Sequence, residues 1–353
     1  MFLHLYKFLM NSYILKGIYI ELLESCNLNC IHCYNNSGAD RNRLSLEKII
    51  EIVDEAEKNN ISTISLSGGE PLLYSELFLL LKYIQENTHL KTTIVTNGTL
   101  LSEMLVSKVL SVIDINRKMF QVSIDGATSF THDYIRGHGS FDKLMSGIKV
   151  LEKHGIFFYF HVVLNKTNIN DVRELVDLAI RYNHSTIDFS MLKSKGRALD
   201  NNNDLLIEPE KLISVIHELN SIKKEKNNQI KINSPSIFYG ECPLWANDDN
   251  ITLSIRISAS GNVYPCQLFS CDSSVIGNIY DQSIDSMICN IQNISRKDKQ
   301  QNKCRNCIVK NICKGGCPGV EWHEDLISDI NKYSDDCKLR ICNFKKIIKE
   351  LKT

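Results

Sequence analysis

The stretch GIYIELLESCNLNCIHC, residues 17–33, decides the fold of this chain. Its first part, Gly17–Leu23, is mostly apolar and predicts a buried β-strand. Three cysteines, Cys26, Cys30 and Cys33, follow this strand directly. A loop of this length can place three thiolates around one face of a compact metal centre. The stretch therefore predicts a strand that ends in a metal-binding loop.

The same alternation of elements continues through the first half of the chain. Stretches with helical spacing separate apolar runs; examples are Leu46–Glu57 behind a Ser45 cap and a helix around Leu175–Ala179, for which Asn168 is a candidate first residue. Parallel neighbouring strands need crossover connections of this length, so the pattern predicts an α/β protein with a parallel sheet, either open or closed as a barrel. The six expected strands are Gly17–Leu23, Ile61–Leu66, Thr92–Val95, Phe120–Ile124, Phe157–Leu164 and Thr186–Met191.

Polar residues follow most of the expected strands. Ligands of parallel α/β folds bind at the carboxyl ends of the strands, where loops and helix N-termini converge. These polar clusters therefore predict one functional site on that rim. The clusters are Glu24–Cys26, Ser67–Glu70, Thr96–Gly98, Ser123–Gly126 and Asn165.

Composition narrows the class of protein. The length of 353 residues fits about two domains. Because 41 basic residues balance 41 acidic ones, no net field draws the chain to nucleic acid or to an anionic membrane. No apolar run is long enough to span a membrane, and the segment Met1–Met10 carries Lys7 and lacks the cleavage site of a secretory signal. We therefore expect a cytoplasmic protein with no nucleic-acid and no membrane partner.

Thirteen cysteines are too many for an ordinary cytosolic enzyme and too sparse for a small disulfide scaffold. The first three supply three ligands, whereas a structural zinc site needs four, and we expect the loop to turn the intervening His32 away. A [4Fe–4S] cluster held by three thiolates keeps one iron open for another molecule. On this spacing alone, a zinc site completed by a distant residue and three buried thiols without metal remain alternatives.

A second motif, Gly68-Gly69-Glu70-Pro71, follows the second expected strand. Paired glycines let the backbone approach a ligand closely, Glu70 offers a carboxylate to an ammonium group, and Pro71 suits the first position of a helix. Alone, the segment is also typical of a tight turn between a strand and a helix. Together, the two motifs resemble the radical S-adenosylmethionine (SAM) superfamily, in which CxxxCxxC follows the first strand and GGEP the second. The resemblance covers residues 17–195.

This resemblance implies a partial (β/α)6 barrel. Cys26, Cys30 and Cys33 would hold a [4Fe–4S] cluster whose open iron binds the methionine part of SAM, and one electron from the cluster would yield a 5′-deoxyadenosyl radical that takes a hydrogen atom from the substrate. The same likeness implies a set of cofactor contacts: Gly68, Gly69, Glu70, Pro71, Asn97, Ser123, Asp125 and Arg136. For Arg136, a surface salt bridge is the alternative.

A second cysteine region occupies the C-terminal third of the chain. Four of its cysteines follow the spacing C-x2-C-x5-C-x3-C, which by itself also suits a zinc ribbon. The complete order resembles the SPASM extension of radical enzymes that modify peptides and proteins, a small cysteine-rich α+β domain with two auxiliary clusters. That resemblance implies three [4Fe–4S] clusters in all. It assigns Cys242, Cys266 and Cys317 to the inner auxiliary cluster and Cys304, Cys307, Cys313 and Cys337 to the outer one.

Two departures from this pattern bear on function. Asp248 stands six positions after Cys242, where sulfatase maturases have a further cysteine, and Gln267 follows Cys266, where they carry an aspartate proposed as the base. The fourth position of the inner cluster is then filled by Cys271, by Asp248 or by a thiolate of the substrate. Otherwise the cysteines left over are expected to be small buried residues; they are Cys271, Cys289 and Cys342.

The motifs predict five segments along the chain. They are an N-terminal extension 1–16, the partial barrel 17–195, a linker 196–235 with one helix from Pro209 to about Lys224, the SPASM domain 236–345 and a C-terminal helix end 346–353.

The function expected is a maturase that abstracts a hydrogen atom from a ribosomally made peptide and forms a crosslink or an oxidised bond, a thioether among them. Its partners would be the peptide or protein substrate, a reductant such as flavodoxin or ferredoxin, and a separate leader-recognition protein, since about sixteen residues precede the first strand. A sulfatase-maturase-like oxidation, disfavoured by Gln267, and a non-catalytic zinc- or cluster-binding scaffold are the alternatives.

Overall fold

The computed structural model describes residues 14–38, 41–182, 186–193, 195–235, 252–269 and 274–288. Within these ranges ten strands form one sheet, in the order β10-β9-β8-β1-β2-β3-β4-β5-β6-β7. All neighbours from β8 to β7 are parallel, whereas β9 and β10 continue the sheet as antiparallel strands. The predicted α/β class with a parallel sheet is confirmed.

The six strands expected from the sequence are all present, with bounds that differ from the expected ones by at most three residues. They are β1 Ile14–Glu21, β2 Thr63–Ser67, β3 Lys91–Thr96, β4 Lys118–Ser123, β5 Phe158–Leu164 and β6 Thr186–Met191. Two short parallel strands extend the sheet, β7 Lys231–Asn233 beside β6 and β8 Thr252–Ile257 beside β1. The antiparallel strands are β9 Asn262–Tyr264 and β10 Gly277–Asn278.

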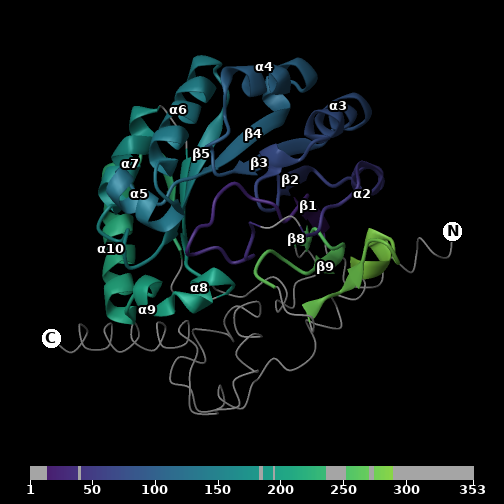
Figure 1. Cartoon of the computed structure of the whole chain (residues 1–353). Coiled ribbons are helices and arrows are strands. Elements are labelled where there is room, and N and C mark those ends of the chain that lie inside the picture. The colour runs from purple at the N-terminus through teal and green to yellow at the C-terminus, as the bar shows by residue number, and fades with distance from the viewer. Residues whose placement is uncertain are drawn as a thin grey trace, which may run out of the picture.

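Helices lie outside the curved sheet, and the loop that follows β1, drawn in purple, lies inside the curve (Figure 1). The α-helices are α2 Leu46–Lys58, α3 Leu77–Asn87, α4 Glu103–Val112, α5 Ser129–Arg136, α6 Ser140–Lys153, α7 Val172–Arg181, α8 Arg197–Asp200, α9 Asn202–Leu205 and α10 Pro209–Glu225. Two single turns of 3-10 helix are η1 Pro71–Leu73 and η2 Ile115–Arg117. No helix in the described ranges is both long enough and apolar enough to cross a bilayer.

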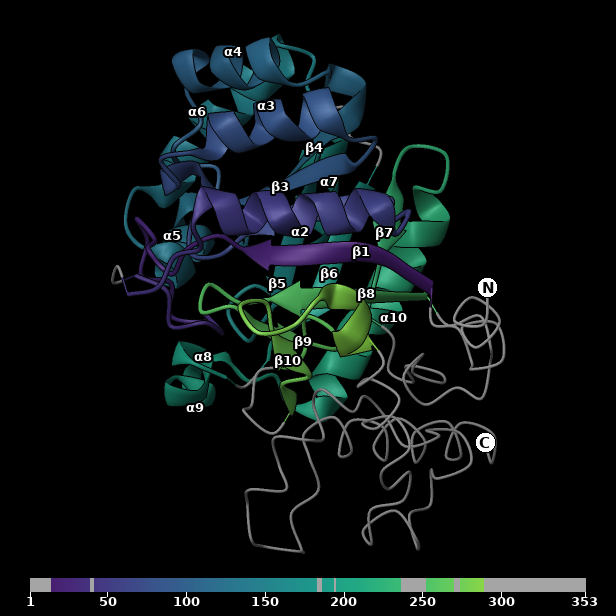
Figure 2. The same ribbon diagram turned by 90° about the vertical axis from the view of Figure 1, so that its right-hand side faces the viewer.

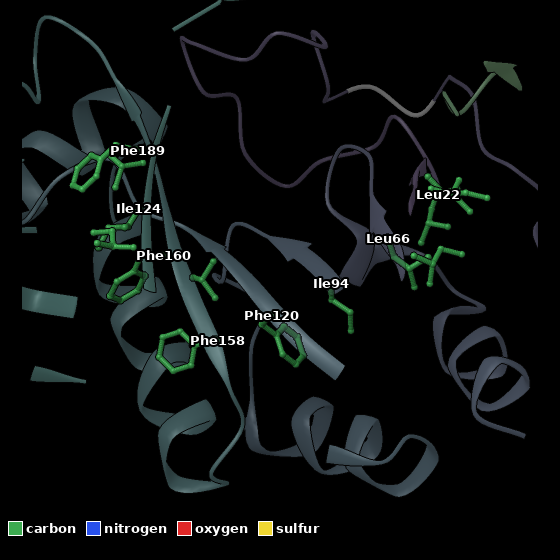
Figure 3. Packing of buried hydrophobic residues seen from close by; sticks show 14 of the residues in the cluster. Leu22, Leu66, Ile94, Phe120, Ile124, Phe158, Phe160 and Phe189 are labelled. Atoms are coloured by element: carbon green, nitrogen blue, oxygen red, sulfur yellow. The ribbon is translucent and has the colours of Figure 1, made fainter. Parts of the chain in front are cut away.

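Side chains alternate strictly along β3, β5 and β6 between fully buried and partly accessible positions. Except for Thr92 and Thr96 of β3, the buried positions carry apolar residues that pack into one core with the helices, and Figure 3 shows Leu66, Ile94, Phe120 and Phe160 in this layer. Because successive side chains of a strand point to opposite faces, the intervening residues face the inside of the curve. The sequence thereby separates a packing face from a face that is free to bind a ligand.

The two helix starts that the sequence addressed have different outcomes. The side chain of Ser45 caps α2 and accepts a hydrogen bond from the amide of Lys48, as predicted. The prediction that Asn168 starts α7 is wrong, because the N-cap is Asp171. Asn168 is instead fully buried, and its amide donates to the carbonyl oxygens of Asp125 and Val163 at 3.1 and 2.9 Å. Asn168 therefore connects the loop after β5 with the end of β4 through hydrogen bonds.

The segment 196–235, expected to be a linker with one helix, contains α8, α9, α10 and β7. Strand β8, from the expected SPASM domain, pairs directly with β1, and Figure 2 shows β8 beneath β1, with β9 and β10 further from it. The sheet therefore continues across the expected domain boundaries, which stay a prediction. Several residues of the sequence predictions lie outside the described ranges: Met1–Met10, Cys242, Asp248, Cys271, Cys289, Cys304, Cys307, Cys313, Cys317, Cys337, Cys342 and residues 346–353.

Candidate active site

A cavity of about 290 Å³ opens at the carboxyl rim of the parallel strands. Its size lies at the lower end of the range for small-molecule sites. The cysteine loop after β1, the two glycines after β2, the ends of β3 to β6, the segment after β6 and the residues after Cys266 all line it. The polar clusters that follow β1 to β4 in the sequence therefore contribute to one site, as predicted, whereas Asn165, expected there as well, does not line the cavity.

The three cysteines of the loop line this cavity together. Cys30 is buried, whereas Cys26 and Cys33 are partly accessible. Burial raises the pKa of Cys26 to about 11 and also raises the pKa of Cys30. Both thiols therefore keep their protons at neutral pH unless a metal centre replaces them.

The three thiols of the loop lie in the cavity wall, where they can serve one metal centre. A [4Fe–4S] cluster takes each thiolate on a separate iron. The donor set of the loop Cys26–Cys33 therefore suits three corners of such a cluster.

Both glycines of the GGEP motif are required by the cysteine loop. Gly68 has a φ of +129°, and a Cβ there would lie 2.3 Å from the carbonyl oxygen of Leu23; a Cβ on Gly69 would lie 2.1 Å from that of Ser25. The amides of Gly69 and Glu70 donate to these same two oxygens at 2.7 and 2.9 Å. The two glycines thus let the backbone after β2 approach the backbone of residues 23–25 closely. The two hydrogen bonds between these segments hold the start of the cysteine loop in place.

Glu70 is completely buried and does not line the cavity. Its carboxylate accepts hydrogen bonds from the hydroxyl of Thr96 at 2.7 Å and from the amides of Asn97 and Leu72 at 2.8 and 3.2 Å. Burial raises the pKa of Glu70 to about 7. Pro71 begins η1, as its missing amide proton allows. Contact between Glu70 and the ammonium group of a cofactor stays a prediction.

Asn97 and Ser123 both line the cavity, at the ends of β3 and β4. The side-chain amide of Asn97 donates to Asn27 at 3.0 Å and lies 4.0 Å from the sulfur of Cys26. Asn97 thus connects the end of β3 with the cysteine loop. The contact of Asn97 and Ser123 with SAM stays a prediction.

The end of β4 holds a buried cluster of charges. The carboxylate of Asp125 receives Nε of Arg136 at 2.6 Å, Nε2 of His32 at 2.8 Å and the amide of Val163 at 2.9 Å. Burial raises the pKa of Asp125, but Arg136 and His32 more than offset this and hold it well below its usual range. The alternative of a surface salt bridge for Arg136 is wrong, because this residue is only 7% exposed.

Arg136 lines the cavity, whereas Asp125 lies behind it. Asp125 therefore orients a cation toward the cavity and holds His32, which stands between Cys30 and Cys33 in the loop. The binding of its imidazole by Asp125 fits the expectation that His32 is not a metal ligand. Whether Asp125 and Arg136 contact the cofactor stays a prediction.

Sequence reasoning missed a second support of the cysteine loop, at the start of α8. Arg197 donates from its backbone amide to the carbonyl of Cys33 at 2.9 Å, from Nε to that of Cys30 at 2.8 Å and from Nη1 to that of Ser37 at 2.8 Å. Gly196 has a φ of +55°, and a Cβ there would lie 2.5 Å from the Cys33 carbonyl. The Gly-Arg pair after the sixth strand was the available signal.

A third support connects the loop with β8. Oε1 of Glu21 accepts hydrogen bonds from Asn35 at 2.8 Å, Tyr34 at 3.3 Å and Arg256 at 3.0 Å. The guanidinium of Arg256 also lies 4.2 Å from the ring centroid of Tyr264. The charged Glu21 inside an apolar strand was visible in the sequence, but its partner more than two hundred residues later was not.

Cys266 is the one cysteine of the expected SPASM ligand set that lies in the described ranges. Its sulfur accepts a hydrogen bond from the amide of Leu268 at 3.4 Å. Gln267 and Leu268 line the cavity, and Lys195 donates from Nζ to the carbonyl of Leu268. The residues next to this expected auxiliary ligand therefore form a wall of the same cavity.

Family comparisons agree with this arrangement. Residues 20–179 match the family model described as the Radical SAM superfamily, and residues 250–308 match SPASM, described as an iron-sulfur cluster-binding domain. The chain therefore carries a radical SAM domain and a SPASM domain, which confirms the assignment predicted from its motifs. SAM and iron–sulfur clusters are accordingly its cofactors.

Individual relatives differ in what they act on. The chain is 27% identical to the AdoMet-dependent heme synthase of Methanosarcina barkeri, over 84% of this chain and 89% of that protein. It is 26% identical to the mycofactocin maturase MftC of Mycobacterium tuberculosis, over 88% and 80%. The structure of Streptococcus suis SuiB bound to its precursor peptide SuiA has a TM-score of 0.73 at 18% identity, covering 92% of this chain and 76% of SuiB. At that identity the likeness to SuiB concerns the fold alone.

Proposed function

We propose that this protein is a radical SAM maturase that removes a hydrogen atom from a ribosomally made peptide and forms a crosslink, a thioether among the possibilities, or another oxidised bond. The observation that carries this proposal is the shared cavity, because the three loop thiols, the paired glycines and the residues after Cys266 all line it. MftC, a maturase, and SuiB, whose structure contains a precursor peptide, support a peptide as the substrate.

When bound, the cluster and SAM supply an electron and then a centre that accepts a hydrogen atom from the substrate. Cys26, Cys30 and Cys33 would hold the cluster, and the backbone contacts of Arg197 would keep their loop in place. Arg136 presents a cation to the cavity that suits the carboxylate of SAM. The chain's own contribution is to orient the reactants and to exclude water.

The proposal includes three [4Fe–4S] clusters, one in the barrel and two in the SPASM domain. A reductant such as flavodoxin or ferredoxin would supply electrons, and a separate leader-recognition protein would bring the peptide. Anaerobic reconstitution followed by metal analysis tests the cluster count, with about twelve irons per chain expected. A zinc content without iron would support the scaffold alternative instead.

The decisive experiment replaces the loop cysteines one at a time. Cys26→Ala, Cys30→Ala and Cys33→Ala should each abolish formation of 5′-deoxyadenosine from SAM with dithionite, because each thiolate holds one corner of the cluster. Full product from any of the three variants would show that the loop does not hold the reactive cluster.

The tail cysteines provide the matched comparison. Cys304→Ala, Cys307→Ala and Cys313→Ala should remove the outer auxiliary cluster and destabilise the SPASM domain, because metal binding there is coupled to folding. Cleavage of SAM without substrate should partly survive in these variants. Equal loss of cleavage in both sets would contradict separate roles for the two regions.

A second candidate function is favoured by the heme synthase of Methanosarcina barkeri, which matches most of this chain. On that likeness the substrate would be an iron tetrapyrrole. Incubation of the reconstituted protein with SAM, dithionite and either candidate precursor peptides or iron coproporphyrin separates the two. A peptide that becomes lighter by two hydrogen atoms supports the maturase, whereas release of carbon dioxide from the tetrapyrrole supports the alternative.

A further inference from the structure

We propose that His161 is a catalytic residue that accepts the proton released when the substrate is oxidised. The inference rests on the proposed function and adds a residue that neither the motifs nor the comparisons assign. Its basis is the position of this imidazole in the cavity together with the chemistry of the other lining groups.

Forming one new bond from two bonds to hydrogen releases two protons and two electrons. In the proposed reaction the C–H bond of the peptide breaks first, and its hydrogen atom leaves with one proton and one electron. The remaining carbon radical joins a second atom of the peptide, whose bond to hydrogen breaks. The electron left over passes to an auxiliary iron–sulfur cluster, and the proton needs a base within reach.

Carboxylates, the usual bases, are absent from the described lining of the cavity. Gln267 lies in that lining at the position where the sequence resemblance places the aspartate proposed as the base of sulfatase maturases, and its amide cannot accept a proton. The lysine and arginine side chains of the lining donate hydrogen bonds and have no acceptor, and the thiols are reserved for the cluster. Tyr19 and Tyr34 also line the cavity, but burial raises the pKa of both, so their hydroxyls stay protonated and do not take up a further proton. Histidine is the remaining type of base.

Two histidines line the cavity, and they differ in what their rings can do. Nε2 of His32 is bound to Asp125, and its Nδ1 is buried with no hydrogen-bond partner, so this ring is closed to a substrate. His161 lies at an inward position of β5, and its backbone pairs with Ser123 of β4 and Asp188 of β6. Its ring makes no hydrogen bond to another described residue, which leaves a ring nitrogen for the substrate.

Burial, more than the charges that face it, keeps the ring of His161 neutral. Burial lowers its pKa, Asp125 and Asp188 raise it, and Arg136 and His32 lower it, with a net decrease from the ordinary value. A ring that is neutral at physiological pH can take up a proton as the new bond forms and can pass it to solvent afterwards. The low pKa therefore suits the role that the geometry assigns.

The proposal separates the two candidate functions. Oxidative loss of a carboxyl group releases carbon dioxide and one electron after the hydrogen atom is removed, so it needs no proton acceptor. Formation of a crosslink needs one. A base on β5 would therefore take part in the reaction of the maturase and would have no role in the tetrapyrrole reaction.

The test compares His161→Gln with His217→Gln, a matched change at an exposed position of α10. Reconstituted enzyme is supplied with SAM, dithionite and the precursor peptide that the wild type modifies. We expect His161→Gln to retain its iron and to form 5′-deoxyadenosine, while modified peptide per 5′-deoxyadenosine falls by about 100-fold, as loss of a general base does. His217→Gln should match the wild type.

A second variant and a pH profile exclude a merely structural role. His161→Ala should be partly rescued by added imidazole, and the fall in wild-type product formation at acidic pH should be missing from His161→Gln. An unchanged product ratio and pH profile in His161→Gln would overturn the role of His161 alone. A wild type that leaves peptides unchanged but releases carbon dioxide from iron coproporphyrin would overturn the proposed function as well.

Discussion

Two carboxylates on the rim, Glu70 after β2 and Asp125 after β4, are both completely buried, yet their pKa values shift in opposite directions. Glu70 accepts hydrogen bonds from neutral groups, the hydroxyl of Thr96 and two backbone amides, and its pKa is raised to about 7. Asp125 receives Arg136 and His32, and its pKa is held well below the usual range. Equal burial therefore leads to opposite shifts when the charge of the partners differs.

We call the end of β4 the fixed side of the rim, because the charge of Asp125 does not change near neutral pH. The end of β2 is the adjustable side, because the charge of Glu70 does change there. At the end of β4, Asp125 stays charged and keeps both Arg136 and the cysteine loop oriented through two short contacts. At the end of β2, the charge of Glu70 changes near neutral pH, where a bound cation would favour the ionised form. A cofactor with an ammonium group would thus alter the electrostatics of only one side of the site.

The largest effect is expected when the fixed side loses its anion. Asp125→Ala leaves Arg136 as a buried cation without its partner, which should destabilise the protein by about 3–5 kcal/mol. Denaturant unfolding at neutral pH, on protein of matched iron content, measures this. The double change Asp125→Ala with Arg136→Met should recover part of the loss, because the unpaired charge is gone. A loss below about 1 kcal/mol in the single variant would show that the pair is not buried as described.

The titration of Glu70, on the adjustable side, should make the free energy of unfolding depend on pH. Glu70 ionises near 4.5 in the unfolded chain and near 7 in the folded protein, so the folded state binds more protons between these values. The free energy of unfolding should therefore decrease as the pH rises through this window, by roughly 3 kcal/mol from this residue. Asp125 acts in the opposite direction, since its contribution is present at neutral pH and is lost as the pH falls below about 4.

Glu70→Gln tests this directly. The amide does not titrate, so the decrease of stability between about pH 5 and pH 7 should become shallower, whatever constant offset the changed hydrogen bonds add. Unfolding curves across that range for wild type and variant provide the measurement. Identical slopes would place the pKa of Glu70 near its ordinary value and remove the contrast with Asp125.

The affinity for SAM tests whether Glu70 contributes to binding of the cofactor. Glu70→Ala should weaken SAM binding by about tenfold, the scale of one lost polar contact in a buried site, while the iron content stays that of the wild type. Equilibrium binding to the iron-loaded protein, together with iron analysis, checks both parts. Loss of the cluster with the cofactor would mean that Glu70 supports the cysteine loop and does not serve SAM.

The sequence predicted the strands and the position of the cysteine loop well because both depend on local patterns. Apolar or alternating runs rich in β-forming residues locate β3 to β6, and the cysteine spacing locates the loop. The ionisation of Glu70 and Asp125 was not predictable in this way. The partners that decide it come from other segments, such as Thr96 for the first and both Arg136 and His32 for the second.

Tertiary partners also explain the other differences from the sequence predictions. Gly68 and Gly69 line the cavity, and their approach to a ligand stays a prediction, but the backbone of the cysteine loop that occupies the space of their Cβ atoms was not expected. Arg197 was assigned to a linker because the Gly-Arg pair alone does not reveal the three distant carbonyl groups that it binds. Strand β7 was missed because its three residues carry no periodic signal, whereas β8 is as long as β3 and its sequence TLSIRI alternates, so its signal was available.

The smallest effect is expected where a carboxylate is bound by a partner at the protein surface. Glu57 on α2 accepts hydrogen bonds from the ring of His89 at 2.7 Å and from its amide at 2.9 Å, and these hydrogen bonds lower its pKa. The side chain of His89 is 98% exposed and that of Glu57 is 30% exposed, so water screens the pair. Glu57→Gln should therefore change the free energy of unfolding by less than about 1 kcal/mol at neutral pH, as at other exposed pairs. A loss near that of Asp125→Ala would show that hydrogen bonds at an exposed site stabilise the protein as strongly as the buried contacts of Asp125.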